Sequence, residues 1–99
     1  GKVIKIIDGD TIDVMLDLGF EIQKRVRCRL SNINAPAITT PEGKKAKKFL
    51  IEKLPINETI TVVSNKYDKY GRSIATIYYN NVNINQLLLD NNHAVIYKE

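Results

Sequence analysis

The chain has 99 residues, of which 43% are hydrophobic and 26% charged, a composition typical of one globular domain and not of a disordered or fibrous chain. Its apolar stretches are far shorter than the roughly 20 residues that a membrane-spanning helix needs, and no signal-like segment is visible. We therefore expect a soluble protein, whose cellular location the sequence does not indicate. Cys28 is the single cysteine, which excludes an internal disulfide and a cysteine-based metal cluster.

The formal net charge of +4 is unevenly distributed along the chain. Residues 1–23 contain two lysines and five acidic residues, whereas residues 24–48 contain eight basic residues and the single acid Glu42. An acidic segment followed by a basic one can place a cation site beside a surface that attracts phosphate. A charged face that is merely solvated would have the same composition.

The first 30 residues predict three β-strands. Residues 2–7 and 11–16 are rich in β-forming residues, and the Asp8-Gly9-Asp10 sequence between them is a strong hairpin signal. A turn near Gly19 leads into residues 20–30, where the alternation of apolar and cationic residues from Arg25 onward predicts a third strand with one apolar and one cationic face. The alternating residues are Arg25, Arg27 and Arg29 on one face and Val26, Cys28 and Leu30 on the other.

A loop and an amphipathic helix follow. Residues 31–41 have loop composition, and Thr40 with Pro41 suits the N-cap and first position of a helix that ends before Pro55. Apolar residues recur there at helical spacing, with lysines on the opposite face. The apolar residues are Ala46, Phe49, Leu50 and Leu54.

The last 42 residues predict two strands, a second helix and a short extended end. Residues 58–64 and 73–79 have strand composition on either side of a turn, and Asn83 with Gln86 resembles a capping box at the start of a helix. Residues 94–97 form the final extended piece. This order of elements favours one domain over the whole chain, built as a small closed or partly open β-barrel with helices (α+β), over a parallel βαβ sheet.

Two carboxylates flank the turn at Gly9. Asp10 has the parity of the apolar residues of its strand, so its side chain is expected at the rim of the barrel, where a hard cation could be held by oxygen ligands. Turn propensity alone accounts for Asp8 and can also account for Asp10. One carboxylate does not make a metal site.

Two arginines from separate elements can form a phosphate clamp. Arg29 ends the cationic face and Arg72 follows a later turn, and guanidinium groups offer paired donors to the nonbridging oxygens of a phosphodiester. Lys69 and Tyr70 in that turn suit a terminal phosphate or a stacked base, although exposed turn residues are common. His93, without a second histidine, is interpreted as a capping or packing residue.

Three motifs in sequence carry a resemblance to a known family. They are Ile7-Asp8-Gly9-Asp10-Thr11, then Arg29 followed by Ile33-Asn34-Ala35-Pro36, then Asp68-Lys69-Tyr70-Gly71-Arg72. Together they resemble the staphylococcal nuclease (thermonuclease) family, over nearly the whole chain. The resemblance implies a five-stranded OB-fold of the SNase-like type and a calcium-dependent nuclease, a hydrolase of phosphodiester bonds in DNA and RNA. The implied partner is single-stranded DNA or RNA, bound by a monomer without membrane contact.

The resemblance also implies roles for the cationic residues. Arg29 and Arg72 match the two arginines that hold the phosphate and stabilise the pentacoordinate transition state. Lys69 and Tyr70 match positions that contact the terminal phosphate of a bound nucleotide. Tyr97 is only a candidate for a further tyrosine that binds phosphate.

The metal and general-base positions depart from the family pattern. Asp10 matches the aspartate that binds calcium, Asn34 falls on a second aspartate, and Ala35 on a residue whose carbonyl oxygen binds the metal. Ala37 falls on the glutamate that activates or positions the attacking water. Because an amide has no negative charge and a methyl group is no base, we expect weakened calcium binding and very slow or absent hydrolysis. Glu42 is a conceivable substitute, but the helix dipole already accounts for an acid there.

Two explanations fit these departures. Asparagine for aspartate preserves shape and alanine for glutamate deletes a base, as in a nuclease disabled by design with its fold and binding surface kept. This explanation is favoured because the other positions that carry the resemblance are intact. The alternative is a natural OB-type module that binds nucleic acid or a protein without cutting.

Overall fold

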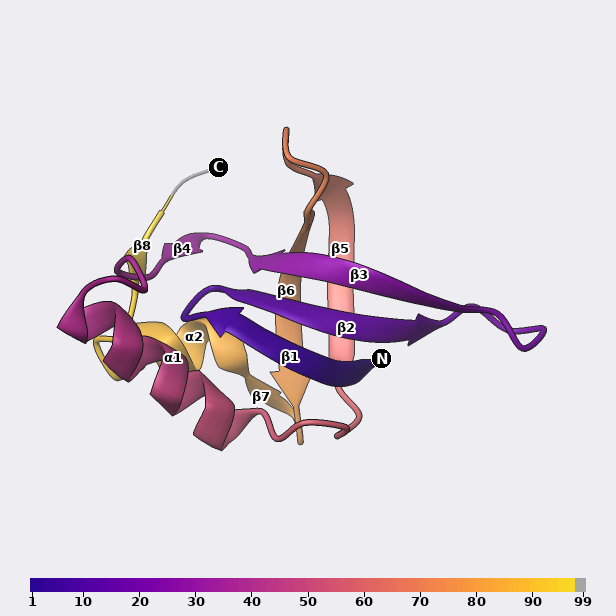
Figure 1. Ribbon diagram of the computed structural model, residues 1–99, viewed down its shortest axis with the longest axis horizontal. Helices are drawn as coiled ribbons and strands as arrows, with labels where there is room; N and C mark the ends of the chain where they lie inside the picture. Colours follow the sequence, from indigo (N-terminus) through magenta and orange to yellow (C-terminus); the bar gives the residue numbers. More distant parts are fainter. Residues whose placement is uncertain (98–99) are drawn as a thin grey trace.

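The computed structural model describes residues 1–97, and of Asn65 only the backbone. Eight strands and two helices follow one another along the chain (Figure 1). In the part of the chain that the structure describes, neither helix is long and apolar enough to span a bilayer. The elements are β1 (Lys2–Asp8), β2 (Thr11–Asp17), β3 (Gln23–Leu30), β4 (Ile33–Asn34), α1 (Pro41–Lys53), β5 (Thr61–Tyr67), β6 (Ser73–Tyr79), β7 (Val82–Asn83), α2 (Ile84–Asp90) and β8 (Val95–Ile96).

Five strands form a curled sheet in the order β1-β2-β3-β6-β5 (Figure 1). Neighbouring strands are antiparallel except β3 and β6, which pair in parallel. The two ends of the sheet meet just before β5, where Lys2 bridges Thr59 and the amide of Val3 donates to the carbonyl oxygen of Glu58 at 3.1 Å. This closure gives the small barrel of OB type, with helices, that the sequence predicts.

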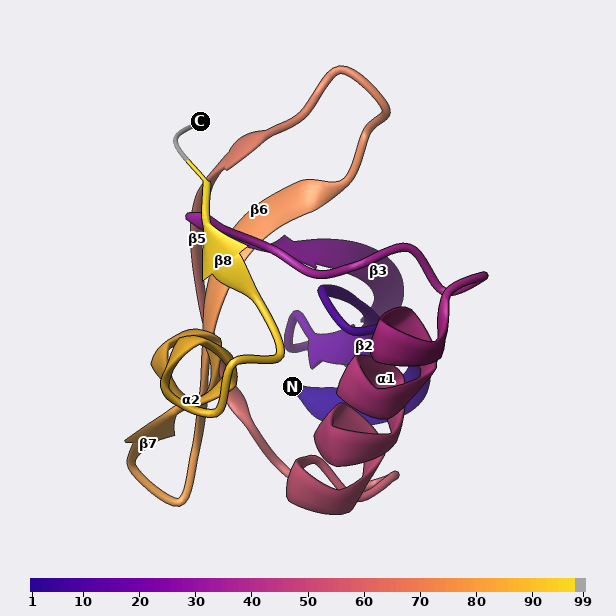
Figure 2. The same cartoon turned by 90° about the vertical axis from the view of Figure 1, so that its left-hand side faces the viewer.

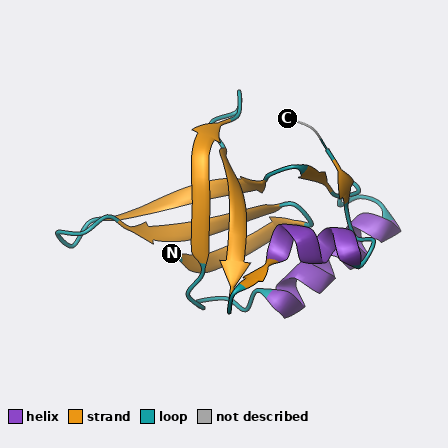
Figure 3. Cartoon of the chain, turned by 180° about the vertical axis from the view of Figure 1, so that it is seen from behind, coloured by secondary structure: helices purple, strands orange, loops and turns teal. Residues whose placement is uncertain are grey.

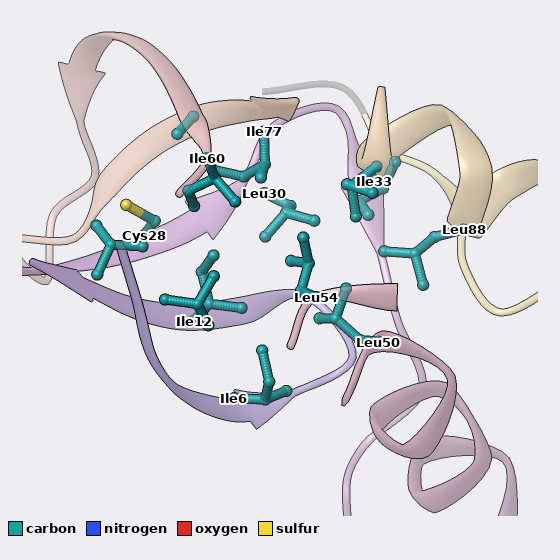
Figure 4. Close-up of a cluster of buried hydrophobic side chains, with 14 of the residues drawn as sticks. Ile6, Ile12, Cys28, Leu30, Ile33, Leu50, Leu54, Ile60, Ile77 and Leu88 are labelled. Atoms are coloured by element: carbon teal, nitrogen blue, oxygen red, sulfur yellow. The ribbon is translucent and has the colours of Figure 1, made fainter. Parts of the chain in front are cut away.

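The helices lie together at one end of the barrel, and the β2–β3 hairpin projects from the other end (Figures 2 and 3). Side chains from both helices and from the sheet meet in one core, with Leu50 of α1 and Leu88 of α2 fully buried among the strands (Figure 4). The end of β3 lies beside the β1–β2 turn, where the Leu30 amide donates to the carbonyl oxygen of Asp10 at 2.8 Å, and α1 packs on that turn through Ala46. The sheet contributes Ile12, Leu30 and Ile77 to this core, among others.

Both helices begin at the predicted caps. The Thr40 hydroxyl accepts a hydrogen bond from the Gly43 amide at 3.0 Å and donates to the carbonyl oxygen of Ala37 at 2.7 Å. A Cβ atom on Gly43 would lie 1.9 Å from that carbonyl oxygen, so only glycine lets the preceding loop lie on the helix. At α2 the Asn83 side chain accepts from the Gln86 amide at 3.1 Å.

Two predicted strands have different limits in the structure. The third strand starts at Gln23, not at residue 20, because Phe20 (φ 52°) and Glu21 (φ 63°) have left-handed backbone conformations that belong to the turn. The strand predicted over residues 58–64 covers Thr61–Tyr67. The segment before it is used instead to close the barrel against β1.

Asp13 is a buried carboxylate on the face of β2 that lies opposite the core. Its side chain is 2% exposed and accepts hydrogen bonds from Arg25 Nη2 at 2.7 Å and from Arg27 Nε at 2.9 Å. The hydrogen bond from Arg27, together with that from Arg25, holds the pKa of Asp13 below its usual range despite burial. The two arginines therefore stabilise the charged form of Asp13.

We expect this cluster to make stability depend on pH. Because the folded-state pKa of Asp13 is depressed, its contribution is complete above about pH 4, the unfolded value, and is lost as pH falls through the folded-state pKa. At pH 7 the Asp13→Asn variant should be less stable by about 2 kcal/mol, the worth of charge-assisted hydrogen bonds. Urea unfolding of the parent and the variant at pH 7 and pH 3 measures the difference in unfolding free energy at each pH. An unchanged difference between variant and parent at the two pH values would contradict the assignment.

Candidate active site

The predicted metal carboxylate and the first predicted arginine lie side by side. Asp10 precedes β2 and Arg29 is the last residue but one of β3, and their exposed fractions are 7% and 9%. The β1–β2 turn packs closely on the loop before α1, since a Cβ atom on Gly9 would lie 2.9 Å from the Cβ atom of Ala35. Glycine at this turn therefore allows the loop to approach the carboxylate.

Hydrogen bonds join four of the predicted site residues. Asp10 Oδ2 accepts from the Ala35 amide at 2.9 Å and lies 3.4 Å from Arg29 Nη2. The same nitrogen of Arg29 donates to Asn34 Oδ1 at 3.2 Å, while Nη1 donates to the carbonyl oxygen of Leu30 at 2.7 Å. The guanidinium group is thus held in one orientation by backbone, amide and carboxylate oxygens.

Asp8 belongs to this site as well, which the sequence interpretation missed. Its carboxylate accepts from the Asp10 amide at 3.1 Å, as its turn role predicts. Burial, reinforced by a hydrogen bond between the two carboxyl groups, raises the pKa of Asp10 to about 6. Burial also acts to raise the pKa of Asp8, but its hydrogen bonds with Asp10 and Thr11 outweigh burial and lower it. Two carboxyl groups therefore lie close together at the partly buried β1–β2 turn.

Arg72, the second predicted arginine, lines the same cleft as Arg29, and the volume of this cleft is about 290 Å³. Arg29 lines one side of the cleft, and the turn between β5 and β6 supplies Lys69, Tyr70 and Arg72. Tyr97, the candidate phosphate-binding tyrosine, also lines it. The remaining lining residues are Lys66, Tyr67, Asp68 and Ile74.

Asp68 fixes Arg72 in this cleft, a role that the sequence interpretation did not assign. Asp68 Oδ2 accepts from Arg72 Nε at 2.6 Å, and Oδ1 accepts from the amides of Tyr70 and Arg72 at 2.9 Å each. The Tyr70 ring centroid lies 5.3 Å from Arg72 Cζ and 5.2 Å from Lys69 Nζ. The turn therefore presents an arginine, a lysine and an aromatic ring as one unit.

Ala37, the position at which the resemblance expects a general base, lies on the loop before α1. Ala37 is exposed, and its carbonyl oxygen accepts from Thr40 at the helix start. Among the described residues no hydrogen bond joins Ala37 to Asp10 or Arg29. Glu42 is exposed in the first turn of α1, where the helix dipole accounts for it.

The donors at this site are those that a hard cation prefers. The carboxylates of Asp8 and Asp10, the Asn34 amide oxygen and the Ala35 carbonyl are all oxygen ligands, and crowded carboxyl groups gain from a cation between them. Within residues 1–97, however, no group of three or more His, Cys, Asp or Glu side chains is placed to hold a metal ion. The oxygen donors are of the type that calcium prefers, but only the carboxylates of Asp8 and Asp10 contribute negative charge.

His93 packs on the first helix, as the sequence interpretation expects, and lines a small hollow with Asn34 and Ala35. Its ring centroid lies 4.4 Å from that of Phe49, and its amide donates to the carbonyl oxygen of Leu88 at 2.9 Å. Lys53 Nζ lies 5.5 Å from the Phe49 ring centroid on the same helix. These contacts join α1 to the end of α2 and leave His93 a structural role.

Comparison with known proteins gives the family. The family model described as staphylococcal nuclease homologue matches residues 27–99. An uncharacterized endonuclease of Escherichia coli O157:H7 is 33% identical over 100 residues, covering 100% of this chain and 61% of that protein. A micrococcal nuclease of Shigella flexneri is 33% identical over 78 residues, covering 79% of this chain and 41% of that protein. The chain thus spans 61% or less of the length of these two relatives. It belongs to the staphylococcal nuclease family.

Proposed function

We propose that this chain is a calcium-dependent nuclease domain in a form whose hydrolysis is very slow or absent. Its substrate is single-stranded DNA or RNA, bound by a monomer. The observation that supports this best is the placement of Arg29 and Arg72 on one cleft, with Asp10 directly beside Arg29. The nuclease names of the relatives agree with a phosphodiester substrate.

The arginines carry the electrostatic part of the reaction. A phosphodiester in the cleft meets two guanidinium groups, each a rigid fork of donors that keeps its charge at any working pH. Negative charge grows on the equatorial oxygens as water attacks phosphorus. Since Arg29 and Arg72 are already oriented by Asn34 and Asp68, they stabilise that charge with little rearrangement.

The carboxylate side of the site would hold the metal. Asp8, Asp10, the Asn34 amide oxygen and the Ala35 carbonyl are the residues that would bind calcium. When bound, calcium supplies a positive charge that polarises the phosphate oxygens. Asp10 binds a cation as a carboxylate, so the raised pKa of its carboxyl group means that protons compete with calcium at this site.

The attacking water finds no base at position 37. Ala37 offers only a methyl group, and loss of a general base typically costs about 10²- to 10⁴-fold in rate. Cleavage of end-labelled single-stranded DNA should therefore be at least about 10²-fold slower than by the Asn34→Asp/Ala37→Glu variant, and a calcium chelator should abolish it. Equal rates for the chain and this variant would contradict the proposal.

A non-catalytic module that binds nucleic acid is the second candidate. It is favoured by the combination of a complete cationic cleft with a neutral amide and a methyl group at the two departing positions. Such a module predicts binding that weakens with salt and does not need calcium, because contacts to phosphate release counterions. Any calcium-dependent hydrolysis by the chain itself would exclude this candidate.

A further inference from the structure

A second hollow adjoins the phosphate cleft on the side away from Arg29. Its volume is about 460 Å³, and it is lined by Arg27, Tyr70, Gly71 and Arg72. Tyr70 and Arg72 line both spaces, so they separate Arg29 in the cleft from Arg27 in the hollow. The sugar-phosphate backbone of a strand bound in the cleft can therefore continue into the hollow.

The strand register explains why Arg27 reaches this place. In the parallel pairing of β3 with β6, Cys28 is the partner of Ser73. Arg27 and Arg72 directly precede these partners, so they flank the start of the pairing, where adjacent strands lie about 4.8 Å apart. Arg27 and Arg29 share one face of β3 and are separated by roughly 6.6 Å along the strand. The three arginines thus form a short cationic row.

Arg27 is oriented but not used up by its ion pair. Its Nε and Nη2 atoms donate to Asp13, at 2.9 Å and 3.3 Å, and its side chain remains 51% exposed. Of the five guanidinium donors these bonds use two, which leaves Nη1 for a ligand. Asp13 also accepts from Arg25, so one carboxylate faces two arginines and one positive charge stays in excess.

We propose that Arg27 forms a second phosphate subsite, which binds the phosphodiester next to the one held by Arg29 and Arg72. The inference rests on the proposed function, since it takes a nucleic-acid strand as the ligand of the cleft. Tyr70, 70% exposed between the two subsites, offers its ring to the intervening base. Asp13 is a positioning residue that aims the Arg27 guanidinium group.

Arg25 provides a matched control. It has the same charge as Arg27, a similar exposed fraction of 54%, and a hydrogen bond to the same carboxylate. It lines neither the cleft nor the hollow. An alanine at either position removes one positive charge and leaves Asp13 with one arginine, although Arg27→Ala removes two hydrogen bonds to Asp13 and Arg25→Ala removes one.

The test is binding of a fluorescent eight-residue oligothymidylate, with thymidine 5′-phosphate as a competitor that has a single phosphate. Arg27→Ala should weaken oligonucleotide binding about tenfold and lower the slope of log affinity against log salt by about 1, with competition by the mononucleotide unchanged. Arg25→Ala should leave the oligonucleotide affinity, the salt slope and the competition by the mononucleotide near the parent values. Arg27→Lys should recover part of the affinity, because it restores the charge without the fork.

The outcomes separate this inference from the proposed function. If Arg27→Ala and Arg25→Ala weaken oligonucleotide binding equally, or if neither weakens it, the Arg27 subsite is wrong. The proposed phosphate site at Arg29 and Arg72 is not affected by that result. If the parent chain shows no salt-sensitive binding, the proposed function fails and the subsite with it. Urea unfolding of both variants checks folding, and if Arg27→Ala is unfolded, Arg27→Gln against Arg25→Gln decides by the same criteria.

Discussion

The Asn34→Asp/Ala37→Glu variant should cleave single-stranded DNA in the presence of calcium about 10²- to 10⁴-fold faster than the chain as it stands. The first change adds a negative charge beside Asp10 and Arg29, where Asn34 Oδ1 already accepts a hydrogen bond. The second adds a carboxylate that can orient water and take its proton. Both positions are exposed, so the longer side chain at 37 needs no repacking.

Matched variants separate the two effects. Asn34→Asp alone should tighten calcium binding with a small gain in rate, whereas Asn34→Asp/Ala37→Gln should bind calcium equally well and remain slow. The rate difference between the Ala37→Gln and Ala37→Glu forms then measures the base itself. A folded double variant that binds calcium and cuts no faster than its Ala37→Gln counterpart would show that position 37 does not supply the base.

Asn85→Ala should cost about 3 to 5 kcal/mol of unfolding free energy, the largest single stability effect that we expect. Asn85 is 5% exposed and ties three backbone segments together. Its Oδ1 accepts from the Ile77 amide at 3.1 Å, while Nδ2 donates to the carbonyl oxygens of Ser31 at 3.0 Å and Ala75 at 3.1 Å. Alanine removes these three hydrogen bonds and opens a cavity, while the Ala75 carbonyl oxygen keeps the Ser31 amide as a donor at 2.8 Å.

Gln86→Ala is the control for this prediction. Gln86 is the next residue of α2, and its side chain makes one exposed hydrogen bond to Asp90. Its loss should change the unfolding free energy by no more than about 0.5 kcal/mol. Urea unfolding of both variants decides the matter. A similar small loss for Asn85→Ala would mean that Asn85 does not join α2 to the barrel.

Local signals predicted much of this fold. The hairpin at Gly9, the caps at Thr40 and Asn83 and the alternation before Leu30 each depend on neighbouring residues, and each is found. The parallel pairing of β3 with β6 and the contact of residues 57–60 with β1 join distant segments. Such pairings leave no periodic trace in either segment, so they could not be predicted from local patterns.

The site shows the same division. The motifs named Asp10, Arg29 and Arg72, and the structure brings Asp10 to Arg29 and both arginines to one cleft. The sequence interpretation assigns Asp8 and Asp68 no site role because a turn aspartate needs no further explanation in a sequence. Their second contacts, to the Asp10 carboxyl group and to the Arg72 guanidinium group, exist only in three dimensions. The one signal in the sequence for a site role of Asp8 is its spacing from Asp10 in Asp8-Gly9-Asp10.

The central claim is that Arg29 and Arg72 hold the phosphate of a nucleic-acid strand. Binding of a single-stranded oligonucleotide to the Arg29→Ala/Arg72→Ala variant tests it most directly, with Lys44→Ala/Lys45→Ala on the exposed side of α1 as a control of equal charge loss. Arg72→Ala alone provides the comparison if loss of the buried Arg29 unfolds the chain. We predict that the arginine variants lose at least about tenfold in affinity and that the lysine variant stays near the parent. Equal losses in the arginine and lysine variants, or none in either, would contradict the claim.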